Sequence, residues 1–207
     1  GYGADKVYVC DSPLLKDYTT DGYTKVICDL VREFKPEVML FGASNIGRDL
    51  GPRCAARLHT GLCADCTHLD IDTENYKEYL RGASSLAPAA IDGIKDESRN
   101  LKMTRPAFGG HLMATIICPR FRPAMATVRP GVMQRIHPAA ESSAKVENYK
   151  VELPRESFNV EILDIVKKVS DKMDIQDAKI LVSGGRGMGC PENFQLLEDL
   201  AAAFGGG

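Results

Sequence analysis

The sequence predicts an α/β protein built on a parallel sheet that helices cover on both faces. Two short apolar runs, 6–10 (KVYVC) and 38–41 (VMLF), are typical of strands in such a sheet. Between them, residues 18–34 carry apolar side chains at the spacings of one helical face. A second helix is expected from about residue 42 to residue 58. This alternation of strand and helix is the order that produces parallel sheets.

Shorter elements are expected in the rest of the chain. Residues 73–100 are charged and lack clean periodicity, which predicts a surface insertion, and 130–150 predict a loop or linker. Residues 160–169 fit a strand or a helix equally well. The remaining predictions are strands at 67–72, 101–104, 113–118, 125–128 and 179–183 (KILVS), a glycine-rich turn at 184–189, and a helix at 191–204.

Composition excludes several classes of protein. The 207 residues include 26 basic and 28 acidic side chains, so no global charge draws the chain to nucleic acid or to a membrane surface. The sequence contains no run of 18 apolar residues, so it predicts no membrane span. Seven cysteines, most of them in apolar runs, favour a reducing, cytoplasmic location without a disulfide framework. The first residues show no signal-peptide pattern.

The segment SGGRGMG, Ser183 to Gly189, lies between a predicted strand and a predicted helix. Glycines at such a position let backbone amides approach an anion. The guanidinium of Arg186 would add a planar positive group suited to a phosphate or to the edge of a flavin ring. The segment matches neither a Walker loop nor a strict GxGxxG motif. A tight turn with Arg186 in solvent remains an equal alternative.

Residues 101–140 contain no aspartate or glutamate. Three of the arginines in this segment precede proline, which biases their backbone toward an extended conformation. The pattern predicts a local anion site or a surface for an acidic partner. The alternative is a solvated face whose counter-charges come from elsewhere in the fold. The six basic residues are Lys102, Arg105, Arg120, Arg122, Arg129 and Arg135.

Three weaker patterns remain. His59, Cys63, Cys66 and His68 could form a zinc site, but their close spacing and apolar surroundings favour buried thiols. Cys190, at the start of a helix, could be a nucleophile, although no histidine is near it in sequence. Ser44-Asn45 follows an apolar strand, where a ligand could bind, but a helix N-cap is the favoured interpretation.

Three long segments, 42–72 (GASNIGRDLGPRC…LDID), 104–133 (TRPAFGGHLMATIICPRFRPAMATVRPGVM) and 179–201 (KILVSGGRGMGCPENFQLLEDLA), resemble the alpha subunit of electron transfer flavoproteins, in particular those of anaerobic bacteria. The resemblance implies a parallel-sheet, nucleotide-hydrolase-like domain over 1–150 that packs on the beta subunit. A linker would follow at 151–178. Residues 179–207 would then form the opening βα unit of a second α/β domain, which binds FAD. It also implies that the family's first strand and helix, and most of its FAD contacts, lie outside this sequence.

The same resemblance implies an electron carrier with FAD as cofactor, not a substrate-transforming enzyme. The partners would be the beta subunit, in a heterodimer, and an acyl-CoA dehydrogenase or similar flavin dehydrogenase of fatty acid β-oxidation. The anaerobic type further implies electron bifurcation between NADH, ferredoxin and that dehydrogenase. Arg186, with Ser183, Gly184, Gly185 and Gly187, would contact FAD, whereas Arg105 would lie near the flavin of the beta subunit. The alternatives are a zinc-stabilised interaction domain and a nucleotide-binding hydrolase.

Overall fold

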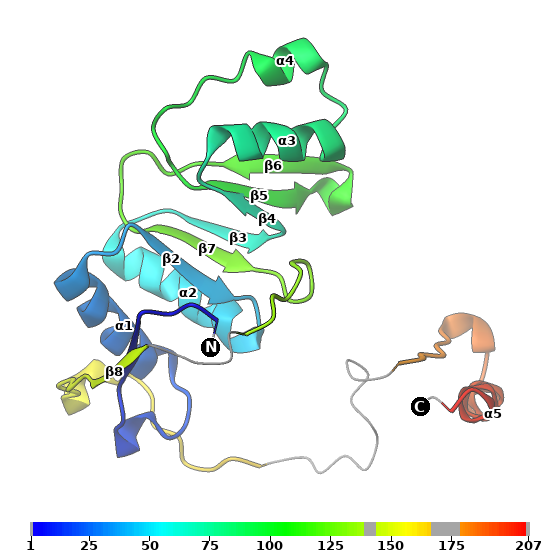
Figure 1. Ribbon diagram of the computed structural model, residues 1–207. Coiled ribbons are helices and arrows are strands. Elements are labelled where there is room, and N and C mark those ends of the chain that lie inside the picture. The colour runs from blue at the N-terminus through cyan, green and yellow to red at the C-terminus, as the bar shows by residue number, and fades with distance from the viewer. Residues whose placement is uncertain (1, 139–143, 167–178, 206–207) are drawn as a thin grey trace. The chain divides into compact units, whose positions relative to one another are not determined.

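The structure, a computed structural model, describes residues 2–138, 144–166 and 179–205. The chain forms two compact units, Gly1–Glu161 and Ile162–Gly207 (Figure 1). Among the described residues, no helix combines the length and the apolar character needed to cross a membrane.

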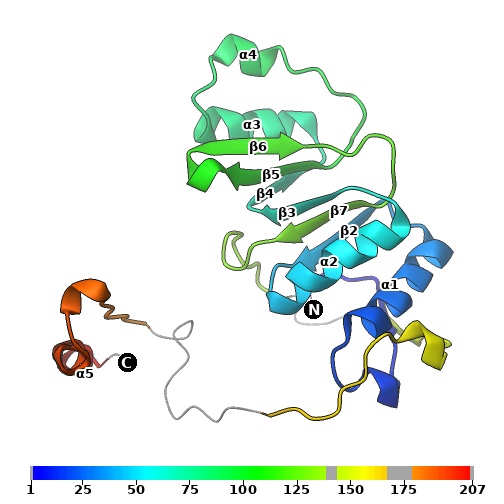
Figure 2. The ribbon, with the colours of Figure 1, turned by 180° about the vertical axis from the view of Figure 1, so that it is seen from behind.

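The centre of the first unit is a parallel sheet with strand order β2-β7-β3. Its strands are β2 (Val38–Gly42), β7 (Ala124–Val128) and β3 (Leu62–Cys66). Helices α1 (Thr20–Phe34) and α2 (Asn45–Leu58) lie together on one face of this sheet (Figure 2). Met125, which is fully buried, packs there against Cys28 and Cys54 of the two helices. The predicted parallel α/β fold class is therefore confirmed.

Within the described residues, no helix contributes to the buried cluster on the other face of this sheet, contrary to the prediction of helices on both faces. A second, antiparallel sheet of order β4-β5-β6 lies beyond β3 (Figure 1), and Met103 of β5 belongs to the same buried cluster as Cys63, Cys66 and Ala126. The side chain of Leu40 in β2 stays 50% exposed. The strands of this second sheet are β4 (His68–Asp70), β5 (Lys102–Ala107) and β6 (Leu112–Ile116).

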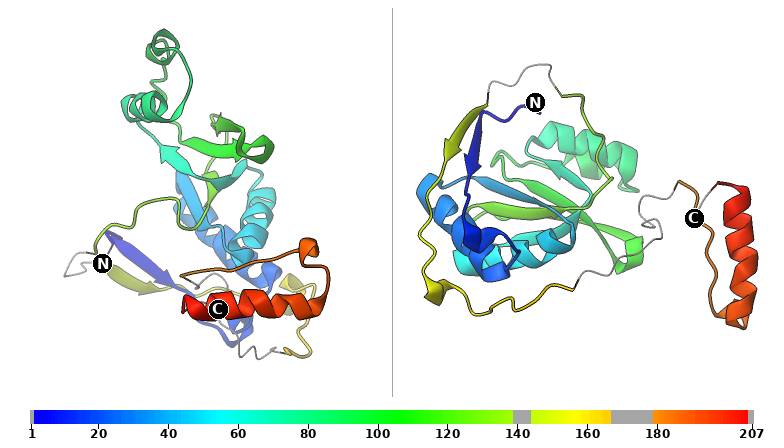
Figure 3. Two further views of the ribbon diagram at one scale, coloured as in Figure 1. Left: turned by 90° about the vertical axis from the view of Figure 1, so that its right-hand side faces the viewer. Right: turned by 90° about the horizontal axis from the view of Figure 1, so that it is seen from below.

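Two further strands, β1 (Lys6–Val9) and β8 (Lys145–Asn148), form a separate parallel pair. The pair lies beside the end of α1 (Figure 3), where the ring of Phe34 stacks on Tyr8 at 4.6 Å. The prediction of a strand at 6–10 is confirmed. The prediction of a loop or linker at 130–150 is wrong at β8, because this strand has only four residues, with a single apolar one, and gave no apolar run to recognise.

The segment 73–100 contains two helices, α3 (Thr73–Ala83) and α4 (Pro88–Asp92), where the sequence indicated no regular structure. The carboxylate of Asp72 caps α3 by accepting hydrogen bonds from the amides of Glu74 and Asn75. Leu80 and Ile91 are buried, so each helix has an apolar side despite the charge of the segment. The apolar stripe is short, which is why periodicity missed it.

Helix α2 begins as predicted. The Ser44 hydroxyl accepts a hydrogen bond from the amide of Gly47 at 3.2 Å, so Ser44 is the N-cap. A Cβ on Gly47 would lie 1.8 Å from the carbonyl oxygen of Gly42. The turn from β2 into α2 therefore requires glycine at position 47, and the N-cap interpretation of Ser44 is confirmed.

The second unit contains η5 (Pro191–Phe194), a 3₁₀ turn that leads into α5 (Gln195–Ala203). This confirms most of the predicted 191–204 helix. The predicted strand at 179–183 is wrong: these residues are extended or bent, and the described part of the unit offers no strand to pair with them. Residues 160–166 are neither helix nor strand, and 167–169 lie outside the described residues.

Three 3₁₀ turns complete the first unit. They are η1 (Pro13–Leu15), η2 (Phe108–Gly110) and η3 (Arg155–Ser157).

Candidate functional site

The glycine-rich segment forms a compact turn in the second unit. Residues Arg186–Met188 make a short 3₁₀ helix, η4. The amide of Met188 donates to the carbonyl of Gly185 at 2.9 Å, and the amide of Gly189 donates to the carbonyl of Arg186 at 3.1 Å. The side-chain amide of Asn193 donates to the carbonyl of Met188 at 2.6 Å, which ties the turn to η5. The predicted turn at 184–189 is confirmed.

Glycine is required at two positions of this turn for different reasons. A Cβ on Gly184 would lie 2.4 Å from Cδ1 of Leu197 and 3.0 Å from Cγ of Met188, so this glycine permits close packing on α5. Gly189 has φ +81°, a conformation that other residues rarely adopt. A Cβ on Gly185 or Gly187 would meet nothing within 4 Å, so this side of the turn is open.

The turn also carries unused hydrogen-bond donors. Within the described residues, the amides of Gly185, Arg186 and Gly187 have no acceptor, as expected for the first amides of a helical turn. The Arg186 side chain is exposed, and no acidic side chain in the described ranges pairs with it. Free amides and a free guanidinium within one short turn fit an anionic or carbonyl-bearing group such as a flavin nucleotide.

Three of the six cations of the acid-free segment 101–140 are paired with acids from other parts of the chain. Nζ of Lys102 lies 2.9 Å from Oδ2 of Asp96. Nε of Arg122 lies 2.7 Å from Oε2 of Glu37. For these residues the prediction of an anion site is wrong, because the counter-charges are distant in sequence and close in space.

Arg129 also has a counter-charge, which sequence reasoning missed. The carboxylate of Asp65 accepts from Nε of Arg129 at 3.1 Å and from Nη2 of Arg48 at 2.8 Å. Arg129 and then Arg48 hold the pKa of Asp65 below its ordinary value. Asp65 has φ +64° in an interrupted stretch of β3. That irregularity, inside the CxxC motif, is not visible as a sequence pattern.

Arg105 and Arg120 differ from these residues: the described ranges hold no acidic partner for either. Arg105 is half-buried in β5, opposite Ala114 of β6. The only hydrogen bond of its side chain in the described chain is a long one, 3.4 Å, from Nε to the carbonyl of Pro106. Arg135 bonds to the hydroxyl of Tyr2. Arg105 and Arg120 thus remain available to a ligand or partner.

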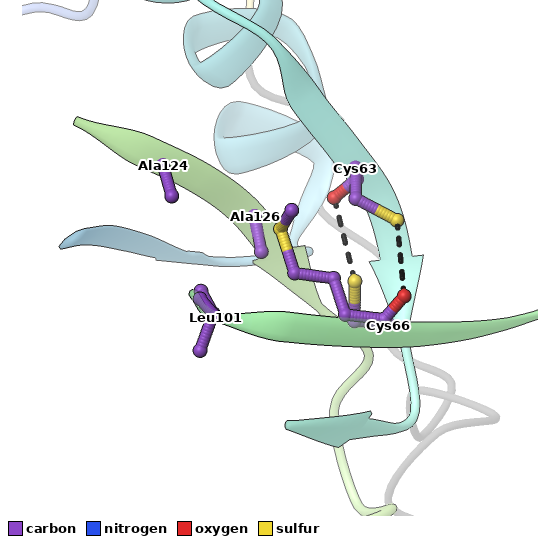
Figure 4. Packing of buried hydrophobic residues seen from close by; sticks show 6 residues of the cluster. Cys63, Cys66, Leu101, Ala124 and Ala126 are labelled. Carbon is purple, nitrogen blue, oxygen red and sulfur yellow. Dashed lines mark hydrogen bonds between the residues drawn. The ribbon is translucent and has the colours of Figure 1, made fainter. Parts of the chain in front are cut away.

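The four residues of the zinc hypothesis do not come together. The Cys63 thiol donates to the carbonyl of Met103 at 3.9 Å, and the Cys66 thiol donates to the carbonyl of Cys63 at 3.5 Å (Figure 4). The neighbouring Cys63 thiol and burial raise the pKa of Cys66, which disfavours the thiolate that a metal needs. The described residues contain no group of three His, Cys, Asp or Glu side chains that could hold a metal ion.

The two histidines have other roles. The ring of His68 stacks on Tyr79 at 3.6 Å and pairs with Asp70. His59 ends α2 as its C-cap, with φ +52°. Cys190 is exposed immediately before η5. All seven cysteines are free thiols.

The fold and the turn define a class: an α/β protein with a parallel sheet, followed by a glycine-rich turn with free amides and a free arginine. Comparison with known families agrees. Residues 1–154 match the electron transfer flavoprotein domain, and residues 174–207 match the electron transfer flavoprotein FAD-binding domain. The chain therefore belongs to the electron transfer flavoprotein family, and the resemblance inferred from sequence is confirmed.

Three relatives illustrate the similarity. The acryloyl-CoA reductase electron transfer subunit beta of Anaerotignum propionicum is 56% identical over 100% of this chain and 57% of its own length. Protein FixB of Clostridium saccharobutylicum is 49% identical over 99% of this chain and 54% of its own length. The electron transfer flavoprotein subunit alpha of Clostridium acetobutylicum is 49% identical, with 99% and 55% covered. The chain thus spans little more than half the length of these relatives.

Proposed function

We propose that this chain belongs to the alpha subunit of a heterodimeric electron transfer flavoprotein, which carries electrons through FAD. The carrying observation is the open side of the SGGRGMG turn, within a segment that matches the FAD-binding domain of the family. In this proposal 1–150 is the domain that packs on the beta subunit, 151–178 is the linker, and 179–207 begins the FAD-binding domain. The two alternatives lack comparable support.

The turn would bind FAD through the residues that its geometry leaves free. FAD supplies the redox chemistry when it is bound. The amides of Gly185 and Gly187 would donate to its electronegative atoms, and Ser183 and Gly184 would border the same site. The guanidinium of Arg186 would stabilise negative charge on the bound group, because a fixed cation costs no reorganisation when that charge develops. Arg186 therefore orients the cofactor and raises its potential.

Arg105 would act in the same way on a flavin held by the beta subunit. Its guanidinium is half-buried and lacks an acidic partner within the described residues, so its charge is not neutralised locally. A half-buried cation beside a flavin raises the potential of that flavin.

The redox partners in this proposal are an acyl-CoA dehydrogenase or similar flavin dehydrogenase, with NADH and ferredoxin if the protein bifurcates electrons. One relative is named as an electron transfer subunit of acryloyl-CoA reductase, which agrees with a partner that acts on acyl-CoA compounds. The seven free thiols agree with a cytoplasmic location. A role in fatty acid β-oxidation follows if the partner is an acyl-CoA dehydrogenase.

The test is the flavin content and potential of the intact alpha subunit co-expressed with its beta subunit. We expect a yellow complex, and we expect Arg186→Ala to lose flavin on gel filtration or to lower the potential of the flavin that remains. Arg155→Ala is the matched control, because Arg155 is also exposed but pairs with Glu161. Arg105→Ala should lower only the potential of the beta-subunit flavin. A colourless wild-type complex would contradict the proposal.

A further inference from the structure

Strand β6 is an open edge of the β4-β5-β6 sheet. It pairs with β5 on one side, and the described chain supplies no strand on the other. Its main contacts within the described chain are with β5 and η2, and one side-chain hydrogen bond joins it to α3, from the hydroxyl of Tyr76 to Oγ1 of Thr115 at 2.9 Å. An unpaired edge presents a row of backbone donors and acceptors that another strand can use.

The register shows which backbone groups face outward. The carbonyl of Thr104 in β5 accepts a hydrogen bond from the amide of Thr67, just before β4, so Thr104 directs its backbone groups away from β6. Thr104 lies opposite Thr115. In an antiparallel pair, two opposed residues either both direct their backbone N–H and C=O groups toward each other or both direct them away. Thr115, and Met113 two residues before it, therefore direct their backbone amides and carbonyls to the open side.

The side chains on this edge are apolar and exposed. Leu112, Met113 and Ile116 are 57%, 48% and 41% exposed in a strand of five residues. Exposed edge strands usually carry lysine, proline or a bulge that discourages pairing, and β6 has none of these. The edge strand β8 differs, since it alternates charged residues with Val146. Strand β6 thus combines a free backbone edge with apolar side chains on both faces.

The surroundings of β6 are positively charged. Arg105 lies across from Ala114 of β6, and Arg120 follows the strand; both lack an acidic partner in the ranges that the structure describes. Residues 101–140 contain no acid at all. A partner segment that covers this edge gains electrostatic attraction if it carries aspartate or glutamate beside its apolar residues.

We propose that β6 accepts a strand of the beta subunit, with alternating apolar side chains and flanking acidic residues, which extends the β4-β5-β6 sheet across the subunit interface. The backbone edge of Met113 and Thr115 supplies the hydrogen bonds, the exposed apolar residues supply buried area, and Arg120 supplies charge complementarity. This inference rests on the proposed heterodimer and assigns the surface through which the first unit forms it.

The direct test is amide hydrogen exchange of the intact alpha subunit, alone and with the beta subunit. We expect exchange in 112–117 to slow on complex formation, and exchange in 145–148 to stay unchanged. Met113→Lys places a charge on the edge and should raise the Kd of the heterodimer by about tenfold or more. Val146→Lys, on the edge strand β8, is the matched control and should leave Kd unchanged, since Val146 is also exposed. Arg120→Glu should weaken association and reduce its dependence on salt.

Other results overturn the inference in distinguishable ways. If a flavin-containing heterodimer forms with unchanged exchange in 112–117, or Met113→Lys binds as tightly as wild type, the surface is wrong and the proposed function stands. If the alpha subunit alone forms a dimer that protects 112–117, a second copy is the occupant. If the wild-type subunits do not associate, the proposed heterodimer itself is wrong, and the inference about β6 is wrong with it.

Discussion

Replacing Asp21 by asparagine is expected to destabilise the first unit by about 2–3 kcal/mol. The Asp21 side chain, at the start of α1, is only 8% exposed. It accepts hydrogen bonds from Nη2 of Arg53 at 2.9 Å, and from the backbone amide and Nδ2 of Asn159 at 3.2 and 2.8 Å. Phe158 packs on Gly22 beside it, so this carboxylate fixes the end of the unit against α1.

The magnitude follows from these contacts. Hydrogen bonds to a charged group contribute about 1.5–3 kcal/mol each, and asparagine keeps only one of two acceptor oxygens while it loses the charge that faces Arg53. For a unit of this size the loss corresponds to a Tm lower by about 5–10 °C. Hydrogen bonds from Asn159, and then Arg53, hold the pKa of Asp21 below its ordinary value. This stabilisation is complete above the ordinary aspartate pKa and is lost as pH falls through the lower folded-state pKa.

The assay is urea denaturation of wild type and Asp21→Asn near neutral pH and at about pH 3, where the difference between them should shrink. Glu37→Gln is the matched control: Glu37 also contacts an arginine, Arg122 at 2.7 Å, but its side chain is 82% exposed. That change should cost less than about 0.5 kcal/mol. Equal losses for the two variants would refute the argument that burial decides the energy. Faster proteolysis within 155–161 in Asp21→Asn is the second readout.

Three further substitutions test the glycine geometry and a buried ion pair. Gly47→Ala should lower the free energy of unfolding by about 3 kcal/mol or more, because its Cβ would lie 1.8 Å from the carbonyl oxygen of Gly42. Gly82→Ala in α3, where a Cβ meets nothing within 4 Å, should raise it by about 0.5–1 kcal/mol. Urea denaturation measures both changes. Ser98 and then Lys102 lower the pKa of Asp96 to about 2. The stability of the wild type should therefore fall more steeply than that of Asp96→Asn as the pH drops from the ordinary aspartate pKa toward 2. The variant should already be less stable than the wild type at neutral pH, because it leaves Lys102 buried without its acid.

Local signals predicted the parts of the fold that depend on local contacts. Helix α1 was predicted because its apolar residues recur at the spacing of one helical face. Strand β2 was predicted from a short apolar run, and α2 from the residues 42–45 that follow this run. The Ser44 cap was predicted for the same reason, since the cap residue and its amide partner are three residues apart. Strand β3 was missed because Asp65 interrupts its alternation and its cysteines suggested a ligand motif.

In the candidate site, too, the sequence predicted the features that depend on local contacts and missed those that depend on distant residues. The turn at 184–189 is a matter of local backbone conformation, and its sequence is sufficient to predict it. The charge state of residues 101–140 is not local. The acid that neutralises Arg122 lies at position 37, and the acid beside Arg129 lies at position 65. Only the arrangement of strands brings these groups together, so a run without acids could not reveal which cations remain free.

The segment 179–183 shows why a strong strand propensity is weaker evidence than a cap or a turn. A cap or a turn satisfies its own backbone groups within a few residues. A strand satisfies its amides only through a neighbour, and the described part of the second unit provides none. Ile180 and Leu181 are accordingly 40% and 55% exposed. A sequence pattern of this kind predicts what a segment can become beside a partner strand, whereas the turn that follows it forms from its own residues.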